Sequence, residues 1–239
     1  MRLLFIRHGD PDYEHDSLTE TGFKEARALG EKLGKENIDV FYCSTMGRAL
    51  RTAEPTLNAH GAEAIMCDWL REFNHPVNRS EDSGIAWDFL PEKWKNDSLL
   101  YGRDTWLDSE IFRGTDIKKH YDKCIEEFEK VLASHGYERN GELYRVRESN
   151  HKTIAFFGHF GMNSVLISHL LGVNPFILWH NTVIPPTGVT TFYSEERRDG
   201  IASFRMSGLG DVSHLYSQGL EPSFAARFCE CYADDTRHD

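Results

Sequence analysis

Short apolar runs alternate with amphipathic segments along this chain, and that alternation strongly limits the folds open to it. Apolar runs at residues 2–6, 38–42, 64–67 and 153–157 predict buried strands. Helical periodicity predicts helices over about residues 19–35, 46–60, 116–134 and 161–171. Strands that alternate with helices are typical of α/β folds, so we predict a three-layer α/β/α architecture around a mostly parallel central sheet.

Residues at two turns refine this prediction. Ser44 or Thr45 is expected to cap the second helix, because hydroxyl oxygens accept hydrogen bonds from the free N–H groups at a helix start. Residues 189–193 and 201–206 flank a charged turn at Asp199-Gly200, which fits a hairpin or two strands of the sheet.

The periodicity breaks down between about residues 73 and 115. This stretch holds Trp87, Trp94 and Trp106 and many turn residues, so we expect a cap insertion within a single domain of residues 1–239. One or two of these tryptophans are expected at the mouth of a pocket, because such insertions commonly close over sites. Beyond Gly208 the pattern fades, and residues from about 207 to 239 are interpreted as a C-terminal tail.

Composition and charge narrow the partners and the compartment. The net charge of −11 disfavours nucleic acid and anionic membranes as partners, and no apolar run is long enough to span a bilayer. Five scattered cysteines without a CxxC do not form a disulfide framework, so we expect a cytoplasmic protein. Cys229 and Cys231 with His238 could bind a metal, but a free tail with small apolar cysteines is the better interpretation.

Chemically reactive residues follow three of the predicted strands. Arg7-His8-Gly9 follows the first strand, residues 44–48 follow the second, and Gly158-His159 follows the fourth. Because the carboxyl ends of parallel strands meet at one edge of a sheet, we expect these segments to form one site there.

These segments resemble the motifs of the histidine phosphatase (phosphoglycerate-mutase-like) superfamily. Arg7-His8-Gly9 with the later Leu18-Thr19 and Gly22 is similar to the opening signature. The second, third and last motifs are similar to Ser44…Arg48-Ala49…Thr52-Ala53, Leu70-Arg71-Glu72 and Gly158-His159, in family order. The resemblance covers roughly residues 1–72 and 153–206 and implies a phosphoglycerate-mutase-like fold.

The residue types suit the binding of a phosphate monoester. Arg7 and Arg48 offer planar forks for phosphate oxygens, and His159 would add a cationic or hydrogen-bonding donor. The resemblance implies that His8 is the nucleophile and forms a phosphohistidine. Glu72 is the candidate acid that protonates the leaving group and then activates water, which requires a pKa near the working pH and therefore partial burial.

Several alternatives accompany these assignments. Glu81 and Asp82 could replace Glu72 if the loop folds differently. Basic residues of the cap could hold a second anionic group of the substrate, although solvated surface is the better default: Arg79, Lys93, Lys95, Arg103 and Arg113. No metal and no organic cofactor is expected, because two arginines and two histidines supply the positive charge. The partner is a small phosphorylated substrate of unknown identity, and the oligomeric state is open.

Three features depart from the family pattern. Glu14 occupies the position at which many members have a phosphate-binding asparagine, so the loop there must be arranged differently. Phe160 follows His159 where glycine is usual, and its side chain either shapes the pocket or points away. The stretch after Glu72 lacks the Arg-His-Tyr-Gly pattern of true phosphoglycerate mutases. We therefore favour a phosphatase over a mutase, with a non-catalytic phosphate-binding domain as a further alternative.

Overall fold

An eight-stranded sheet forms the centre of the computed structural model, which describes residues 1–77 and 84–224. Its order is β5-β4-β8-β1-β9-β10-β7-β6. The strands are β1 (Arg2–Arg7), β4 (Val40–Ser44), β5 (Ile65–Cys67), β6 (Tyr137–Asn140), β7 (Leu143–Val146), β8 (Thr153–Gly158), β9 (Val189–Arg198) and β10 (Ile201–Asp211). A separate short ribbon pairs β2 (Pro11–Asp12) with β3 (Ser17–Leu18).

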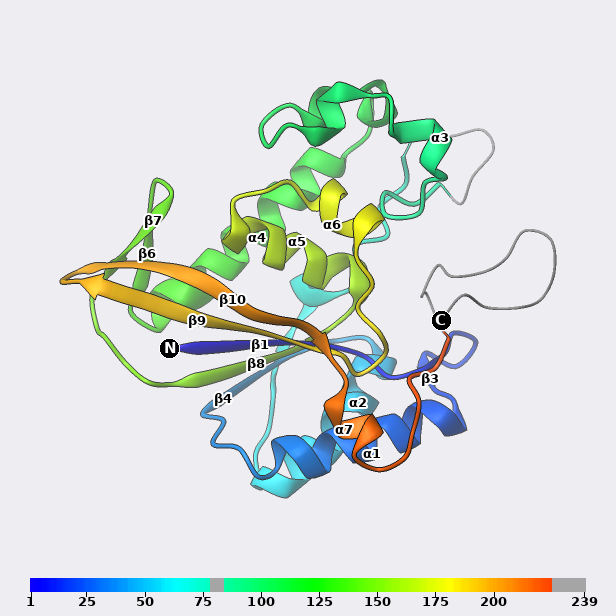
Figure 1. Cartoon of the computed structure of the whole chain (residues 1–239), viewed down its shortest axis with the longest axis vertical. Coiled ribbons are helices and arrows are strands. Elements are labelled where there is room, and N and C mark those ends of the chain that lie inside the picture. Colours follow the sequence, from blue (N-terminus) through cyan, green and yellow to red (C-terminus); the bar gives the residue numbers. More distant parts are fainter. Residues whose placement is uncertain (78–83, 225–239) are drawn as a thin grey trace.

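Helices cover both faces of this sheet (Figure 1). One face carries α1 (Glu20–Leu33), α2 (Gly47–His60) and α7 (Ser213–Tyr216); the other carries α4 (Ile117–Ser134), α5 (Phe160–Leu171) and α6 (Pro175–Asn181). Alternate residues of β1 enter two separate apolar clusters: Leu3 and Phe5 join one, Leu4 and Ile6 the other. Successive strand side chains point to opposite faces, so a strand covered on both sides must be apolar throughout. The predicted three-layer α/β/α fold is confirmed.

The strands that carry the predicted motifs run parallel. β8 lies between β1 and β4, and both pairings are parallel, as is the pairing of β4 with β5. The register aligns Arg7 with Gly158, the last residues of β1 and β8. The carboxyl ends of these strands therefore meet at one edge of the sheet, as the sequence predicts.

The other half of the sheet is antiparallel. β9 and β10 form the predicted hairpin around Asp199-Gly200, where Gly200 has a φ of 69° that favours glycine. A second hairpin, β6–β7, was not apparent in the sequence but contributes the buried rings of Tyr137 and Tyr144 to the larger cluster. β10 extends to Asp211, beyond the expected end of the strand, and α7 follows it.

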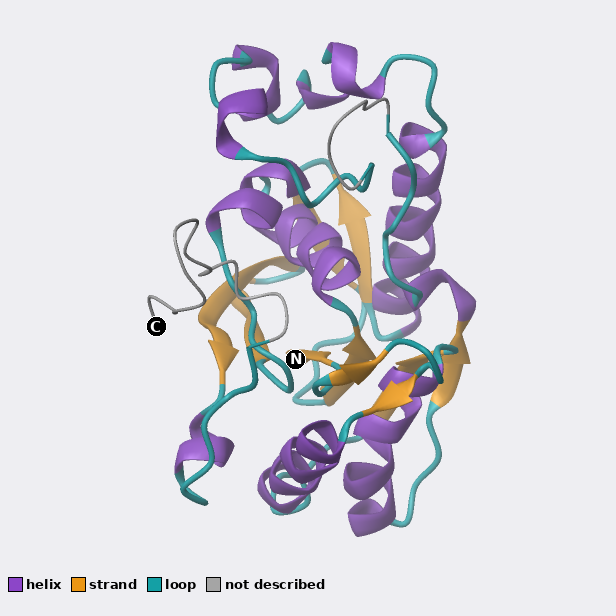
Figure 2. Ribbon diagram, turned by 90° about the vertical axis from the view of Figure 1, so that its right-hand side faces the viewer, coloured by secondary structure: helices purple, strands orange, loops and turns teal. Residues whose placement is uncertain are grey.

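In the expected cap, residues 73–77 and 84–115 have little regular structure. It contains the one-turn helix α3 (Pro91–Trp94) and several 3₁₀ turns. Its buried aromatic side chains pack against Phe176 and Trp179 of α6, so they continue the core rather than form a separate one. In both views the cap lies beyond α5 and α6, on the side away from α1 and α2 (Figures 1 and 2). No helix in the described part of the chain is both long and apolar enough to cross a membrane.

Candidate active site

The predicted site residues come together at the carboxyl edge of the parallel strands. His8 follows β1 and donates its backbone N–H to the carbonyl of Gly158, which ends β8 (3.0 Å). The rings of His8 and His159 lie 5.1 Å apart, centroid to centroid. Arg7 and Arg48 lower the pKa of both histidines electrostatically, which places their charges beside the two rings.

His8 is held in a form suited to nucleophilic attack. Its ring is 2 % exposed, and Nδ1 lies 2.7 Å from the carbonyl oxygen of Gly9. A carbonyl oxygen only accepts, so Nδ1 carries the hydrogen and Nε2 keeps its lone pair. Burial, together with Arg7 and Arg48, holds the pKa of His8 well below its usual range. The ring is therefore neutral at physiological pH, with Nε2 as its basic nitrogen.

The turn after β1 depends on the glycine that follows His8. A Cβ on Gly9 would lie 2.8 Å from the carbonyl oxygen of Gly22 in α1. The Gly9 N–H is fixed by the hydroxyl of Thr52 in α2 (2.9 Å). Any larger residue would push the turn away from both helices and change the direction of the His8 ring.

Two buried arginines retain donor groups that no other atom of the described residues uses. Arg7 and Arg48 are 1 % and 6 % exposed. Arg7 Nη1 donates to the carbonyl of Ile184 (2.6 Å), yet the Nε–H of each arginine is buried without a partner among the described residues. Burial lowers the pKa of Arg7, against the opposing effects of Tyr13, Glu72 and other acidic groups. Buried, unpaired guanidinium donors are costly, and an oxyanion between them would satisfy both.

His159 is fixed by the end of the neighbouring strand. Its Nε2 lies 2.8 Å from Ser44 Oγ at the end of β4, and its Nδ1 is buried without a partner in the described chain. The pKa of His159 is held well below its usual range by burial, then by His8 and the two arginines. Such a neutral ring suits the hydrogen-bonding role predicted for His159.

The predicted side-chain cap of α2 is wrong. The helix begins after Met46, and neither Ser44 nor Thr45 caps it with its side chain. The N-cap residue is Met46. Ser44 Oγ accepts the N–H of Met46 just before the helix (3.2 Å), and it also lies 2.8 Å from the ring of His159.

The side chain of Glu72 packs against the first turn of α5. Its Oε1 accepts the backbone N–H of Phe73 (2.8 Å) and that of Met162 in the first turn of the helix (3.0 Å). Burial raises the pKa of Glu72, against the opposing effects of these two donors, Arg48 and Arg7. Both of these hydrogen bonds use Oε1, so Oε2 is left to carry a proton. The alternatives Glu81 and Asp82 lie outside the described residues, as does Arg79.

Asp16 is a residue near the site that the sequence did not reveal. Its carboxylate accepts from Arg48 Nη1 through Oδ1 (2.7 Å) and from the Gly47 N–H through Oδ2 (2.7 Å). It bends the loop with a φ of 44°, a conformation that asparagine and aspartate tolerate better than most residues. Glu14 is exposed on the same loop, so this carboxylate does not enter the phosphate site. Nothing in the local sequence pairs positions 16 and 48.

Phe160 points into the protein between the site and the cap. The residue is 2 % exposed, the guanidinium of Arg7 lies over its ring at 5.8 Å, and Trp87 meets it edge-on at 6.0 Å. Trp87 is thus the cap tryptophan that reaches the site. The other two cap tryptophans, Trp94 and Trp106, are buried in the core. The bulky residue after His159 therefore packs between Arg7 and the cap.

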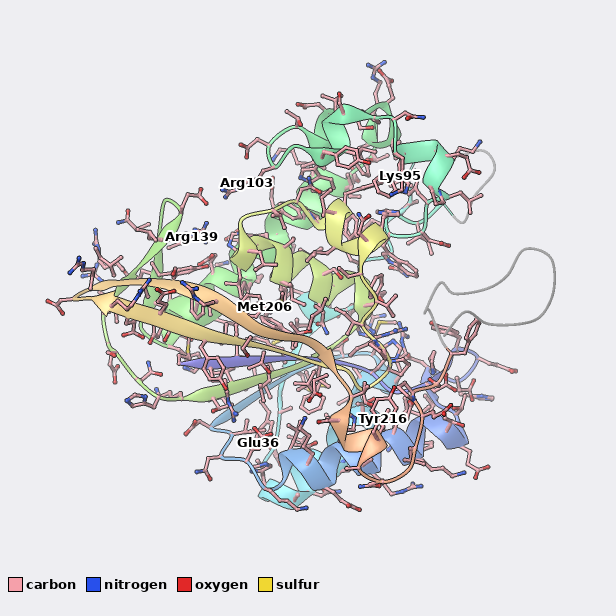
Figure 3. All side chains as sticks on the ribbon, in the orientation of Figure 1. Glu36, Lys95, Arg103, Arg139, Met206 and Tyr216 are labelled. Carbon is pink, nitrogen blue, oxygen red and sulfur yellow. The ribbon has the colours of Figure 1, made fainter. Side chains whose placement is uncertain are left out.

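Cationic side chains of the cap have other partners. Arg103 pairs with Glu142 of the β6–β7 turn at 2.5 Å, Arg113 pairs with Glu110, and Lys95 lies over the ring of Trp94. Lys95 and Arg103 lie well apart on the cap (Figure 3). Among residues 1–77 and 84–224, no three histidine, cysteine, aspartate or glutamate side chains are grouped as a metal site requires. Cys229, Cys231 and His238 lie outside those ranges.

Comparisons with known proteins show the family of this chain. The profile of the histidine phosphatase superfamily (branch 1) matches residues 3–206. The "Putative phosphoserine phosphatase 2" of Hydrogenobacter thermophilus is 25% identical over 206 residues, covering 81% of this chain and 90% of the relative. The "Probable phosphoglycerate mutase GpmB" of Photorhabdus laumondii is 32% identical over 110 residues, covering 41% of this chain and 50% of the relative.

Among solved structures, a phosphoserine phosphatase from Entamoeba histolytica with bound phosphoserine superimposes with a TM-score of 0.58 at 19% identity. The match covers 90% of this chain and 98% of that one. A mycobacterial glucosyl-3-phosphoglycerate phosphatase gives 0.57 at 20% identity, over 87% and 98% of the two chains. These two likenesses concern the fold, and the profile match covers most of the sequence. The chain therefore belongs to the histidine phosphatase superfamily.

Proposed function

We propose that this chain is a metal-independent phosphatase that hydrolyses phosphate monoesters of a small substrate through a phosphohistidine at His8. One observation carries the proposal: a neutral imidazole, with Nδ1–H fixed on Gly9, lies beside two buried arginines whose Nε–H groups have no partner within residues 1–77 and 84–224. A neutral nucleophile can attack phosphorus, and unpaired cationic donors can bind the oxygens of a dianionic phosphate, so the two together suit this reaction.

The first step transfers the phosphoryl group to the enzyme. His8 Nε2 attacks phosphorus as the bond to the ester oxygen breaks, and Glu72 Oε2 delivers its proton to the departing oxygen. Arg7, Arg48 and His159 stabilise the charge on the three equatorial oxygens. The ring of His8 becomes positively charged, and the hydrogen bond from Nδ1 to the Gly9 carbonyl stabilises that charge.

The second step returns the enzyme to its starting state. Glu72 is now a carboxylate and takes a proton from the water that attacks phosphorus. The bond from phosphorus to Nε2 breaks, His8 leaves as a neutral ring, and inorganic phosphate is released. Glu72 must act in both protonation states. Burial raises its pKa, whereas two backbone N–H donors and two arginine charges oppose that rise, and this balance suits both uses.

The substrate class and the setting are part of this proposal. We propose phosphorylated small metabolites as substrates and take phosphoserine as the first compound to test, because two of the similar proteins are named phosphoserine phosphatases. A cytoplasmic setting is supported by Cys43, Cys67 and Cys124, which are free and buried thiols. A mutase would have to exclude water from the phosphohistidine, and the chain lacks the mutase pattern after Glu72.

Hydrolysis of p-nitrophenyl phosphate in the presence of EDTA tests the proposal. Wild-type enzyme should release phosphate at the same rate with and without chelator, and phosphate should not move between hydroxyls of a phosphoglycerate. Phosphate exchange without net hydrolysis would instead identify a mutase. Phosphate binding without turnover of any ester would identify a non-catalytic domain.

The role of Glu72 predicts a dependence on the leaving group. For Glu72→Gln, kcat/KM should fall by about 100- to 1000-fold for alkyl phosphates and far less for p-nitrophenyl phosphate, whose leaving group needs no proton. The amide oxygen can still accept from Phe73 and Met162, so the loop should keep its shape. Because hydrolysis of the phosphohistidine also needs the carboxylate, kcat should converge on one low value for all substrates. An equal loss of kcat/KM for both substrate types would remove Glu72 from the acid role.

A further inference from the structure

The candidate acid and the cap approach each other at Gly161, in the first turn of α5. A Cβ on Gly161 would lie 2.8 Å from Glu72 Oε1 and 2.8 Å from Trp87 Nε1. The missing side chain thus leaves a gap that the carboxylate and the edge of the indole share. Any residue larger than glycine would force one of them away.

The indole N–H at this gap has no acceptor yet. Trp87 Nε1 is buried without a hydrogen-bond partner among the residues that the structure describes. Buried donors are nearly always paired, so an unpaired one at a site indicates a bond that forms in another state of the enzyme. The ring is already held edge-on against Phe160, which is sequence neighbour to both His159 and Gly161.

We propose that Trp87 is a positioning residue for the acid: in the working enzyme its indole N–H donates to Glu72 Oε1 across the gap at Gly161. This inference rests on the proposed role of Glu72. Oε1 then accepts three N–H groups, two from the backbone and one from the cap. Oε2 is the oxygen left to exchange its proton with the leaving group and with water. The cap thereby fixes the direction in which the acid presents its proton.

The hydrogen bond has an electrostatic consequence that can be measured. A donor to a carboxylate stabilises the charged form, so the indole lowers the pKa of Glu72. Glu72 must be protonated for phosphoryl transfer to the enzyme, which kcat/KM reports. It must be ionised for hydrolysis of the phosphohistidine, which kcat reports when that step is slow. Removal of the indole N–H should raise the pKa of Glu72. The basic limb of the pH profile of kcat/KM and the acidic limb of the pH profile of kcat should then both move to higher pH.

Trp87→Phe tests the proposal, because it removes the N–H and keeps an aromatic ring against Phe160. With an alkyl phosphate, the basic limb of kcat/KM should move up by about one pH unit, and the acidic limb of kcat should move in the same direction. Trp106→Phe is the matched control: Trp106 is also buried under the cap, 3 % exposed, and packs against Phe112 and Trp179. It should leave both limbs in place. Unmoved limbs in Trp87→Phe, or equal shifts in both variants, would overturn the proposal.

A second measurement needs neither turnover nor a folded Trp87 variant. The indole ¹⁵N–¹H resonance of Trp87, identified by its contacts with Gly161, should change position with pH in wild-type enzyme and stay constant in Glu72→Gln. A resonance that does not titrate in the wild type would contradict the hydrogen bond. If the Trp87 resonance titrates in this way but the protein hydrolyses no phosphate ester, the proposed function is refuted and the hydrogen bond between Trp87 and Glu72 is still supported.

Discussion

Replacement of His8 by alanine should lower kcat by at least about ten-thousand-fold, the loss typical of removing an enzymatic nucleophile. Arg7, Arg48 and His159 would still bind the ester, so KM should change far less than kcat. The measurement is steady-state hydrolysis of p-nitrophenyl phosphate in EDTA, with substrate binding followed separately by thermal shift.

The His8→Ala protein should nevertheless fold. The ring of His8 is hydrogen-bonded to the carbonyl of the neighbouring Gly9, and the strand before it is fixed by pairing with β8 and β9. An unchanged far-ultraviolet circular dichroism spectrum would verify this. His151→Ala is the matched control, because His151 is exposed in the loop before β8 and should keep full activity. Substantial turnover by His8→Ala would mean that another residue is the nucleophile.

Replacement of Arg7 by methionine, which has a comparable length, should lower kcat/KM by about a thousand-fold. A thioether cannot replace the N–H donors of the buried guanidinium, including the unpaired Nε–H. Both substrate binding and stabilisation of the phosphoryl group during its transfer are therefore lost. The same change removes a buried charge from the free enzyme, which limits the cost to stability.

Ligand-induced stabilisation separates the role of Arg7 in binding from its role in the fold. Vanadate or phosphate at about 100 times its Kd should stabilise wild-type protein by about 2.7 kcal/mol, which corresponds to a rise in Tm of about 5–11 °C at this chain length. In Arg7→Met this rise should vanish. Arg27→Met on the exposed face of α1 is the matched control and should retain it. A full rise in Arg7→Met would place the oxyanion elsewhere.

Local sequence patterns were sufficient for the parallel half of the fold and for the location of the site. β1 and β8 are buried on both faces, so each consists of an unbroken apolar run that a periodicity argument detects. The carboxyl ends of such strands must meet, which brings His8 and His159 together before any contact is known. The β9–β10 hairpin follows from the turn at Asp199-Gly200.

Features that depend on distant partners were not predictable in the same way. The β6–β7 hairpin alternates charged residues with Tyr137 and Tyr144, and its position is set by the pairing of β7 with β10. Asp16 gains its role from Arg48, 32 residues away, and Trp87 from a glycine in α5. The hydroxyl of Ser44 also bonds to the ring of His159, 115 residues away. Such contacts are a product of the tertiary fold, so no local pattern contains them.

The most direct test of the account is to trap the phosphoenzyme. Glu72→Gln enzyme should accept a phosphoryl group from p-nitrophenyl phosphate, which needs no acid, and should hydrolyse it slowly, because the base is missing. Mass spectrometry of a neutral, denaturing quench should then find one added phosphoryl group, on the peptide that contains His8, stable in alkali and lost in acid. Turnover without any such group, or a phosphoryl group on another residue, would contradict the assignment of His8 as nucleophile.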